Sequence, residues 1–334
     1  MPLVRVQPDD LDQIAAVAGI LQAARLVDDP DAYPPLVEEL ASEMRYGWDL
    51  QPDEHFLYFP EGTDSPVATL TTDLPKRDNL KLFWLRLVVH PDHRRRGYGS
   101  AIMAEVLRMA EQAGRSILWV EAIEEDAGAR KFCERFGFGY ASHDARRRQR
   151  LADVDQDAVQ RLWAEAQAAA VDYRLERLLP PVAEETLQEM IEVTAAINDA
   201  PMGQLTFEDE VFDLQRMRDV EAAREGRGDQ SYRVIARHRE TGEIGGHTNV
   251  VISPHRRNLG FQADTAVARS HRGHRLGLLV KIDMMHWLAE AEPQLEVVET
   301  WNNADNRFMI NVNEAIGYRL SQVYATYELN RTSN

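Results

Sequence analysis

The sequence predicts an α/β (α+β) fold made of two tandem copies of one domain. Its 334 residues suit two domains of ordinary size. A segment of the first half also recurs in the second, where LVVHPDHRRRGYGSAIM corresponds to TAVARSHRGHRLGLLVK 178 residues later. The matched pairs at this offset include His93 with His271, Gly99 with Gly277 and Glu121 with Glu299. FCERFGF then matches VNEAIGY at an offset of 180, so Gly137 pairs with Gly317 after a two-residue insertion.

Strands and helices alternate in the same order in both copies. Apolar runs and helical spacing predict strands at 56–60, 65–74 and 81–89, a helix at 100–114, a strand at 116–123 and a helix at 129–137. The second copy repeats this order, with strands at 232–238, 244–253 and 259–267, a helix at 276–291, a strand at 295–301 and a helix at 306–317. A helical segment precedes each copy, at 9–26 and 183–199.

One further helix is expected between the copies, over 153–171, where DVDQDAVQRLWAEAQAAAV opens with an acidic first turn. The predicted organisation is therefore an N-terminal domain at 1–152, a connecting helix at 153–171 and a C-terminal domain at 172–334. RRRQR at 146–150 is expected at a solvated strand edge, where its charges would discourage edge pairing.

Composition narrows the class of protein. The formal net charge is -17, and the acidity is shared by both halves, so no nucleic-acid partner is expected. Cys133 is the only cysteine, which excludes an intrachain disulfide, and no metal-ligand spacing is present. The first residues contain no signal-peptide pattern, and no stretch is apolar enough to span a membrane, so a cytoplasmic location is expected.

The repeated segment combines a strand, a tight turn rich in Gly and Arg, and a helix. This arrangement points backbone N–H groups and the positive end of a helix dipole at one place, which suits a pyrophosphate. Glycines let the backbone approach the anion, and arginines add charged contacts. A dinucleotide-binding turn would need a third Gly that HRRRGYGSAIM lacks, and the GK[ST] of a P-loop is absent.

This segment resembles motif A of the GNAT superfamily of N-acetyltransferases, whose pattern is (Gln or Arg)-x-x-Gly-x-(Gly or Ala). Arg94, Gly97 and Gly99 fit it in full. In the second copy Arg272 and Gly277 fit, but Arg275 stands where the first glycine belongs. The resemblance covers nearly the whole chain and is to the tandem members of the superfamily, with a two-domain arrangement like that of mycothiol synthase. It implies two GNAT domains, each a mixed central sheet flanked by helices, and acetyl-CoA as co-substrate.

The resemblance also implies which residues bind acetyl-CoA. They are the end of the strand before motif A, the turn, the start of the helix and one Asn near the last helix. In this sequence these are Leu87, Val88, Val89, Arg94, Arg95, Arg96, Gly97, Tyr98, Gly99 and Ser100 in the first copy, and Ala266, Val267, Arg272, Gly273, His274, Arg275, Leu276, Gly277 and Asn306 in the second. Asn302 or Asp305 is expected to cap the last helix.

Direct attack of an amine on the thioester needs a base, for which Glu121 and Glu299 are the candidates. Asp264, beside the second motif, is a further candidate for holding a cationic amine. The tyrosine that usually protonates the thiolate in this superfamily is missing, because its positions hold Cys133 and Asn313.

These observations lead to an acetyl-CoA-dependent N-acetyltransferase acting on a small amine, with chemistry expected in the second copy through Glu299. Two alternatives stay open: a non-catalytic acyl-CoA-binding or regulatory protein, suggested by the missing tyrosine, and a protein or peptide N-acetyltransferase. The sequence identifies neither the acceptor nor the oligomeric state.

Overall fold

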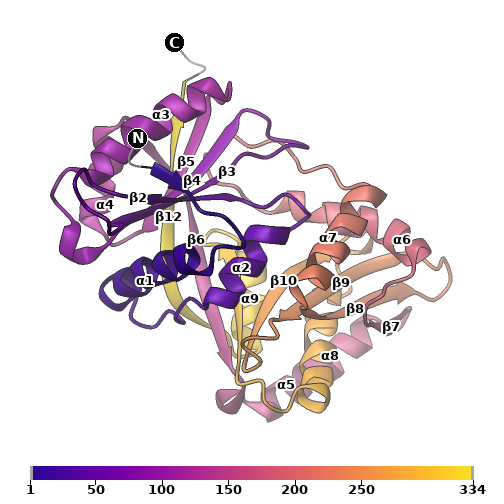
Figure 1. Ribbon diagram of the computed structural model, residues 1–334. Helices are drawn as coiled ribbons and strands as arrows, with labels where there is room; N and C mark the ends of the chain where they lie inside the picture. Colours follow the sequence, from indigo (N-terminus) through magenta and orange to yellow (C-terminus); the bar gives the residue numbers. More distant parts are fainter. Residues whose placement is uncertain (1–2, 332–334) are drawn as a thin grey trace. The chain divides into compact units, whose positions relative to one another are not determined.

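The computed structural model describes residues 3–331 and divides the chain into two compact units (Figure 1). The N-terminal unit contains residues up to His143, the segment Met202–Asp209 and the chain from Gln322 onward. The C-terminal unit contains Asp144–Pro201 and Glu210–Ser321. These units differ from the continuous ranges 1–152 and 172–334, because each takes its last strand from the other half of the sequence.

A mixed sheet forms the centre of the N-terminal unit. Its strand order is β1-β2-β3-β4-β5-β12, antiparallel except for the parallel pair β4 and β5. The strands are β1 Leu3–Arg5, β2 Glu54–Tyr58, β3 Ala68–Asp73, β4 Leu82–Val89, β5 Ile117–Ile123 and β12 Arg319–Asn330. The helices are α1 Leu11–Asp28, α2 Val37–Tyr46, α3 Tyr98–Gln112 and α4 Ala127–Arg135, with a 3-10 turn η1 at Pro91–His93.

The sheet of the C-terminal unit has the same design, with the order β7-β8-β9-β10-β11-β6 and β10 parallel to β11. Its strands are β6 Gly139–Arg150, β7 Tyr173–Leu178, β8 Gln230–His238, β9 Ile244–Ile252, β10 Leu259–Val267 and β11 Val297–Asn303. Its helices are α5 Gln156–Ala169, α6 Glu184–Ala195, α7 Leu214–Arg227, α8 Leu276–Ala291 and α9 Arg307–Ala315, with 3-10 turns η2 Leu151–Asp153, η3 Ala196–Asp199 and η4 Arg269–His271.

The predicted strands and helices of both copies are present. α2 and α7 are additional to the single helix predicted before each copy. Among the described residues, no helix is long and apolar enough to cross a membrane.

The two sheets exchange their last strands. β6 and β12 occupy equivalent places in the repeat, since Gly139–Arg150 and Arg319–Asn330 are 180 residues apart. Residues 144–150 of β6 pair with β11 in the C-terminal unit, and residues 324–330 of β12 pair with β5 in the N-terminal unit. The expectation that 146–150 forms a solvated edge is therefore wrong: Arg146, Arg147, Arg148 and Gln149 are buried in a paired strand.

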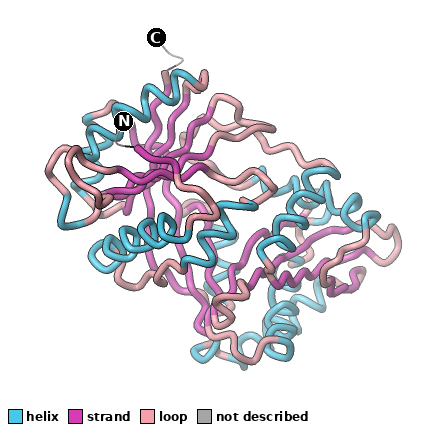
Figure 2. The backbone as a smooth tube through the Cα atoms, in the orientation of Figure 1, coloured by secondary structure: helices cyan, strands magenta, loops and turns pink. Residues whose placement is uncertain are grey.

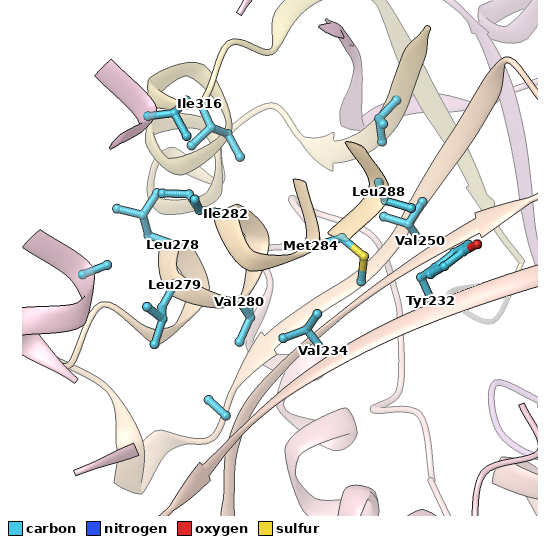
Figure 3. Packing of buried hydrophobic residues seen from close by; sticks show 14 of the residues in the cluster. Tyr232, Val234, Val250, Leu278, Leu279, Val280, Ile282, Met284, Leu288 and Ile316 are labelled. Carbon is cyan, nitrogen blue, oxygen red and sulfur yellow. The ribbon is translucent and has the colours of Figure 1, made fainter. Parts of the chain in front are cut away.

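Helices cover both faces of each sheet (Figure 2). In the N-terminal unit, α1 and α2 pack on the face that carries Leu57 and Val88, and α3 and α4 pack on the opposite face, which carries Phe83 and Leu85. In the C-terminal unit, α6 and α7 cover the face of Ile235. α8 covers the other face, where its apolar residues meet Val234 and Val250 (Figure 3). Successive residues of a strand point to opposite faces, so these contacts fix the face of each strand residue outside the bulges of β8 and β10.

A lysine is buried within the core that α8 forms. The Lys281 side chain is 2% exposed, and its ammonium donates to Gln262 Oε1 at 3.0 Å and lies 5.1 Å from the ring centre of Tyr318. No carboxylate compensates this charge in these contacts, and burial lowers the pKa of Lys281 to about 7.

This pKa predicts a pH-dependent stability. Between pH 7 and about 10, the unfolded state holds a proton on Lys281 that the folded state has lost, so the free energy of unfolding rises with pH. Urea unfolding at pH 7 and pH 9 should show this rise in the wild type and a smaller one in Lys281→Met. Lys131→Met, at an exposed position of α4, is the control and should keep the wild-type difference. An equal rise in all three proteins would contradict the prediction.

Candidate active site

Each sheet contains a place where its two parallel strands stop pairing. The paired residues of β4 and β5 end at Leu85 and Val120, although β4 continues to Val89. In the C-terminal unit the pairing of β10 with β11 ends at Gln262 and Thr300, and a bulge follows in β10. The last residues of β4 and β10 therefore have backbone groups on an edge that the neighbouring strand does not satisfy. These residues include the predicted acyl-end contacts Leu87, Val88, Val89, Ala266 and Val267.

The predicted phosphate turns follow directly and have the same backbone conformation in both units. In the N-terminal unit Arg95 and Gly97 have φ of +62° and +89°. The equivalent residues, Gly273 and Arg275, have φ of +91° and +55°. Glycine and arginine have thus exchanged places, and Arg275 keeps the left-handed conformation at a cost of about 1–2 kcal/mol. The Arg275 side chain pairs with Glu165 of α5 at 2.6 Å.

The two turns differ in the exposure of the first residues of the helix that follows. Arg95, Arg96 and Gly97 are exposed, and Tyr98, Gly99 and Ser100 are half-buried. A Cβ on Gly97 would meet no heavy atom within 4 Å, so the space above this residue is open. At the start of α8, by contrast, Leu276 and Gly277 are buried. The unpaired N–H groups of the first helical turn are thus more accessible at α3 than at α8.

The first arginine of each motif anchors its turn to the protein. Arg94 donates through Nε to the carbonyl of Val89 at 3.1 Å and through Nη1 to Asp28 at 2.7 Å. Arg272 does the same with the carbonyl of Val267 and with Asp199. Bonds from Arg269 and Arg272 lower the pKa of Asp199 to about 2. In this structure both side chains hold the turn in place rather than project towards a phosphate.

Asp28 and Asp199 were not among the residues selected from the sequence. The signal that could have found them is an acidic residue shortly before a proline at the end of both preceding helices, in DDP at 28–30 and DAP at 199–201. Each carboxylate lies where its helix ends, and from there it reaches the turn.

A polar row crosses the face of the N-terminal sheet that α1 and α2 cover. Its members are adjacent residues of neighbouring strands, as the registers of β2, β3, β4, β5 and β12 show: His55, Thr71, Arg86, Glu121 and Thr326. Thr71 Oγ1 lies 3.1 Å from His55 Nδ1, and Arg86 donates to Glu121 at 3.4 Å. Burial, and then the charge of Arg86, lower the pKa of His55 to about 4, so this ring is neutral at pH 7. The row lies where the pairing of β4 and β5 ends.

The C-terminal unit has a different register and different charges at this level. Glu299 is opposite Phe261 of β10 and Arg148 of β6, and Arg233 is opposite Asn249. Arg148 donates to Glu299 at 2.7 Å, and the Nε of Arg146 lies 3.7 Å from the same carboxylate oxygen. Two guanidinium groups of the exchanged strand thus lie close to Glu299, whereas Glu121 accepts a longer bond from Arg86.

Asp264 lies in the bulge of β10, and its negative charge acts on the buried side chains of Arg224 and His247. Burial lowers the pKa of His247 to about 4 despite this carboxylate. Asp264 therefore faces a region that already holds a buried arginine, which weakens the case for a cationic amine beside it.

Among the described residues of the last helices, the two at the expected position of the acid are poorly suited to donate a proton. Cys133 is buried, and burial raises its pKa to about 12. Asn313 is fully buried and donates to Asn302 at 2.7 Å. The cap of α9 is Asn306, whose side chain accepts from the N–H of Met309 at 3.1 Å, so the expected caps Asn302 and Asp305 are wrong. Asp126 caps α4 in the same way.

Comparison with known proteins supports this geometry. Residues 22–138 match the model of the acetyltransferase (GNAT) family. A tandem GNAT protein from the clavulanic acid biosynthesis pathway has the same fold over 99% of both chains, with a TM-score of 0.79 and 23% identity. The chain has the fold of a tandem GNAT protein. A GCN5-related N-acetyltransferase from Sphaerobacter thermophilus is similar over 98% of this chain and 95% of its own, with a TM-score of 0.70 and 15% identity.

Two curated relatives of this chain are named mycothiol acetyltransferase. The one from Saccharomonospora viridis is 32% identical over 136 residues, which are 40% of each chain. The one from Stackebrandtia nassauensis is 27% identical over 157 residues, which are 46% of this chain and 50% of its own. The chain thus spans half or less of the length of these relatives.

The anchoring of the first turn gives a testable prediction. Asp28→Asn removes the charge that holds Arg94, so the turn should lose order and acetyl-CoA should bind more weakly. A loss of about 1 kcal/mol corresponds to roughly fivefold in Kd, measurable by calorimetry. Asp64→Asn, in an exposed loop, is the control and should bind as the wild type does. A lower melting temperature with unchanged affinity would mean that the anchor does not shape the binding turn.

Proposed function

We propose that this chain transfers an acetyl group from acetyl-CoA to the amine of a small molecule, and that the N-terminal unit carries out the reaction. The observation that supports this most is the open turn at the start of α3. Its exposed residues, the free space above Gly97 and the unpaired edge of β4 stand next to one another. A pyrophosphate would be held at the turn, and the thioester would lie along the edge of β4, where a backbone N–H can stabilise the oxyanion.

Glu121 is the proposed base of this unit. It lies on β5 in the polar row, at the level where the strands part, and its side chain is 22% exposed. Its partner Arg86 is 56% exposed and 3.4 Å away, so the pair can open when an amine approaches. Glu299, which was expected to act as base, is held more tightly, and this moves the proposed chemistry to the first unit.

Trp84, a half-buried residue on the face of Glu121, supports a cationic amine as acceptor. Trp84 and Trp119 are two residues before Arg86 and Glu121 on the same strands, and so they share their face. Phe207 stacks on Trp119 with ring centres 5.7 Å apart. Asp73 is adjacent to Trp84 across the strands, and burial raises the pKa of this carboxyl. An aromatic ring at this position favours a small ammonium group.

The C-terminal unit is the second candidate, as a cofactor-binding or structural module without chemistry. The buried start of α8 and the two arginines on Glu299 favour this role. A peptide acceptor is the remaining alternative for the first unit.

The decisive experiment measures thiol release from acetyl-CoA with polyamines, amino sugars and peptide amino termini as acceptors. Turnover with small amines supports the proposal. Turnover only with peptides makes the chain a peptide N-acetyltransferase, and binding of acetyl-CoA without turnover by any acceptor supports the non-catalytic alternative.

A further inference from the structure

We propose that Tyr324 donates the proton to the departing thiolate in the N-terminal unit, and that the exchanged strand β12 thereby completes the active site. This inference rests on the proposed function and assigns the acid that α4 does not supply. The residue that acts on the first unit's substrate would then come from the far end of the sequence.

The register of β12 places Tyr324 beside the point where β4 and β5 part. Tyr324 is opposite Ile123, the last residue of β5, and lies two residues from Thr326, which is opposite Glu121. Because residues two apart share a face, Tyr324 is on the face of the polar row and of Glu121. Its side chain is half-buried.

A hydrogen bond shows in which direction the phenol points. Tyr324 Oη donates to Asp29 Oδ2 at 2.7 Å. Asp29 directly follows α1, which packs on Val88 of β4, and its neighbour Asp28 holds Arg94 of the phosphate turn. The backbone of Tyr324 belongs to β12, which lies on one side of β5. Its hydroxyl contacts the residue after α1, the helix that packs over β4 on the other side of β5. It therefore reaches across the unpaired ends of β5 and β4, where the thioester is proposed to lie.

The chemistry of the step requires such a group. As the amine nitrogen forms its bond to the carbonyl carbon and loses a proton towards Glu121, the C–S bond breaks and the electron pair leaves on sulfur. The phenol gives its proton to this thiolate and regains one from the proton that the amine released, so no further reagent is consumed. Asp29, as the acceptor of the resting bond, orients the hydroxyl before the reaction.

In the C-terminal unit, the residue of β6 with the same register as Tyr324 cannot play this part. Tyr324 is opposite Ile123, and the matching position of β11, Trp301, is opposite Arg146. A guanidinium stays protonated at any pH at which the protein is folded, so it does not donate a proton to a thiolate. Arg146 also lies near Glu299. The same strand position thus gives the first unit an acid and the second unit a fixed charge.

Tyr324→Phe tests the assignment in the full chain, because it removes one oxygen and keeps the ring. We expect kcat to fall by about 10²-fold, with the Kd for acetyl-CoA from calorimetry and the melting temperature unchanged. The high-pH limb of the wild-type kcat profile, which reports loss of the phenol proton, should be absent from the variant. The matched control is Tyr327→Phe, on the same strand but buried on the opposite face, which should keep the wild-type kcat and limb.

Each outcome of this experiment either supports or overturns the assignment of Tyr324. If the wild type turns over acetyl-CoA and Tyr324→Phe is equally active, Tyr324 is not the acid, while the proposed function stands. If both tyrosine variants lose the same activity, the effect is structural and the assignment is overturned. If the wild type acetylates no amine at all, the proposed function fails and this inference fails with it.

Discussion

Glu121→Gln is expected to lower kcat by about 10²-fold, because removal of a general base typically costs 10²–10⁴ in rate. The substitution keeps the shape of the side chain and removes its charge, so the affinity for acetyl-CoA should not change. The deficit should shrink at high pH, where more of the amine is already unprotonated. Steady-state kinetics with the best amine acceptor at several pH values would measure both effects.

Glu299→Gln is the matched comparison, since it makes the same change at the equivalent strand position. Its carboxylate is engaged by Arg148 and lies near Arg146, so its loss should leave turnover close to that of the wild type. A fully active Glu121→Gln together with an inactive Glu299→Gln would place the chemistry in the C-terminal unit and reverse the assignment.

Gly97→Ala is expected to weaken acetyl-CoA binding by at least tenfold, or about 1.4 kcal/mol. The added methyl group would enter the open space where the pyrophosphate must approach the backbone, and φ of +89° is unfavourable for alanine. Calorimetric titration of the variant with acetyl-CoA would measure the loss.

Backbone strain alone must be separated from this effect. Gly114→Ala is suitable, because Gly114 also has a positive φ, of +68°, and open space around its Cβ position, but it follows the opposite end of α3. It should lower the melting temperature by a similar amount without changing the affinity. Equal losses of affinity in the two variants would show that strain, and not the phosphate site, is responsible.

The repeat, the order of its strands and helices, and the position of both turns could be predicted because they depend on local patterns. α7 escaped prediction because its charged sequence has little helical apolar periodicity; Arg216 and Arg224 are among its buried residues. Arg275 departs from the motif, yet the turn keeps its shape because Arg275 adopts the left-handed conformation despite a cost of about 1–2 kcal/mol.

The strand exchange could not be predicted from the sequence, for a different reason. Residues 139–150 and 319–330 carry equivalent patterns, and the pattern of a strand does not say which of two similar edges it pairs with. The ion pairs of Glu299 depend on this strand pairing, because the arginines that contact its carboxylate belong to β6. The role proposed for Tyr324 likewise depends on the strand that the first unit receives.

The exchanged strands also bear on how such a duplicated gene can evolve. Deleting either half would remove the last strand from the sheet of the other and expose a hydrogen-bonding edge. A copy whose chemistry has decayed is therefore retained by selection for the fold of its sister. The residues of its surface and cleft can then change without loss of the fold. The opposite charges of Arg86 and Asp264, at equivalent positions of the repeat, are an example.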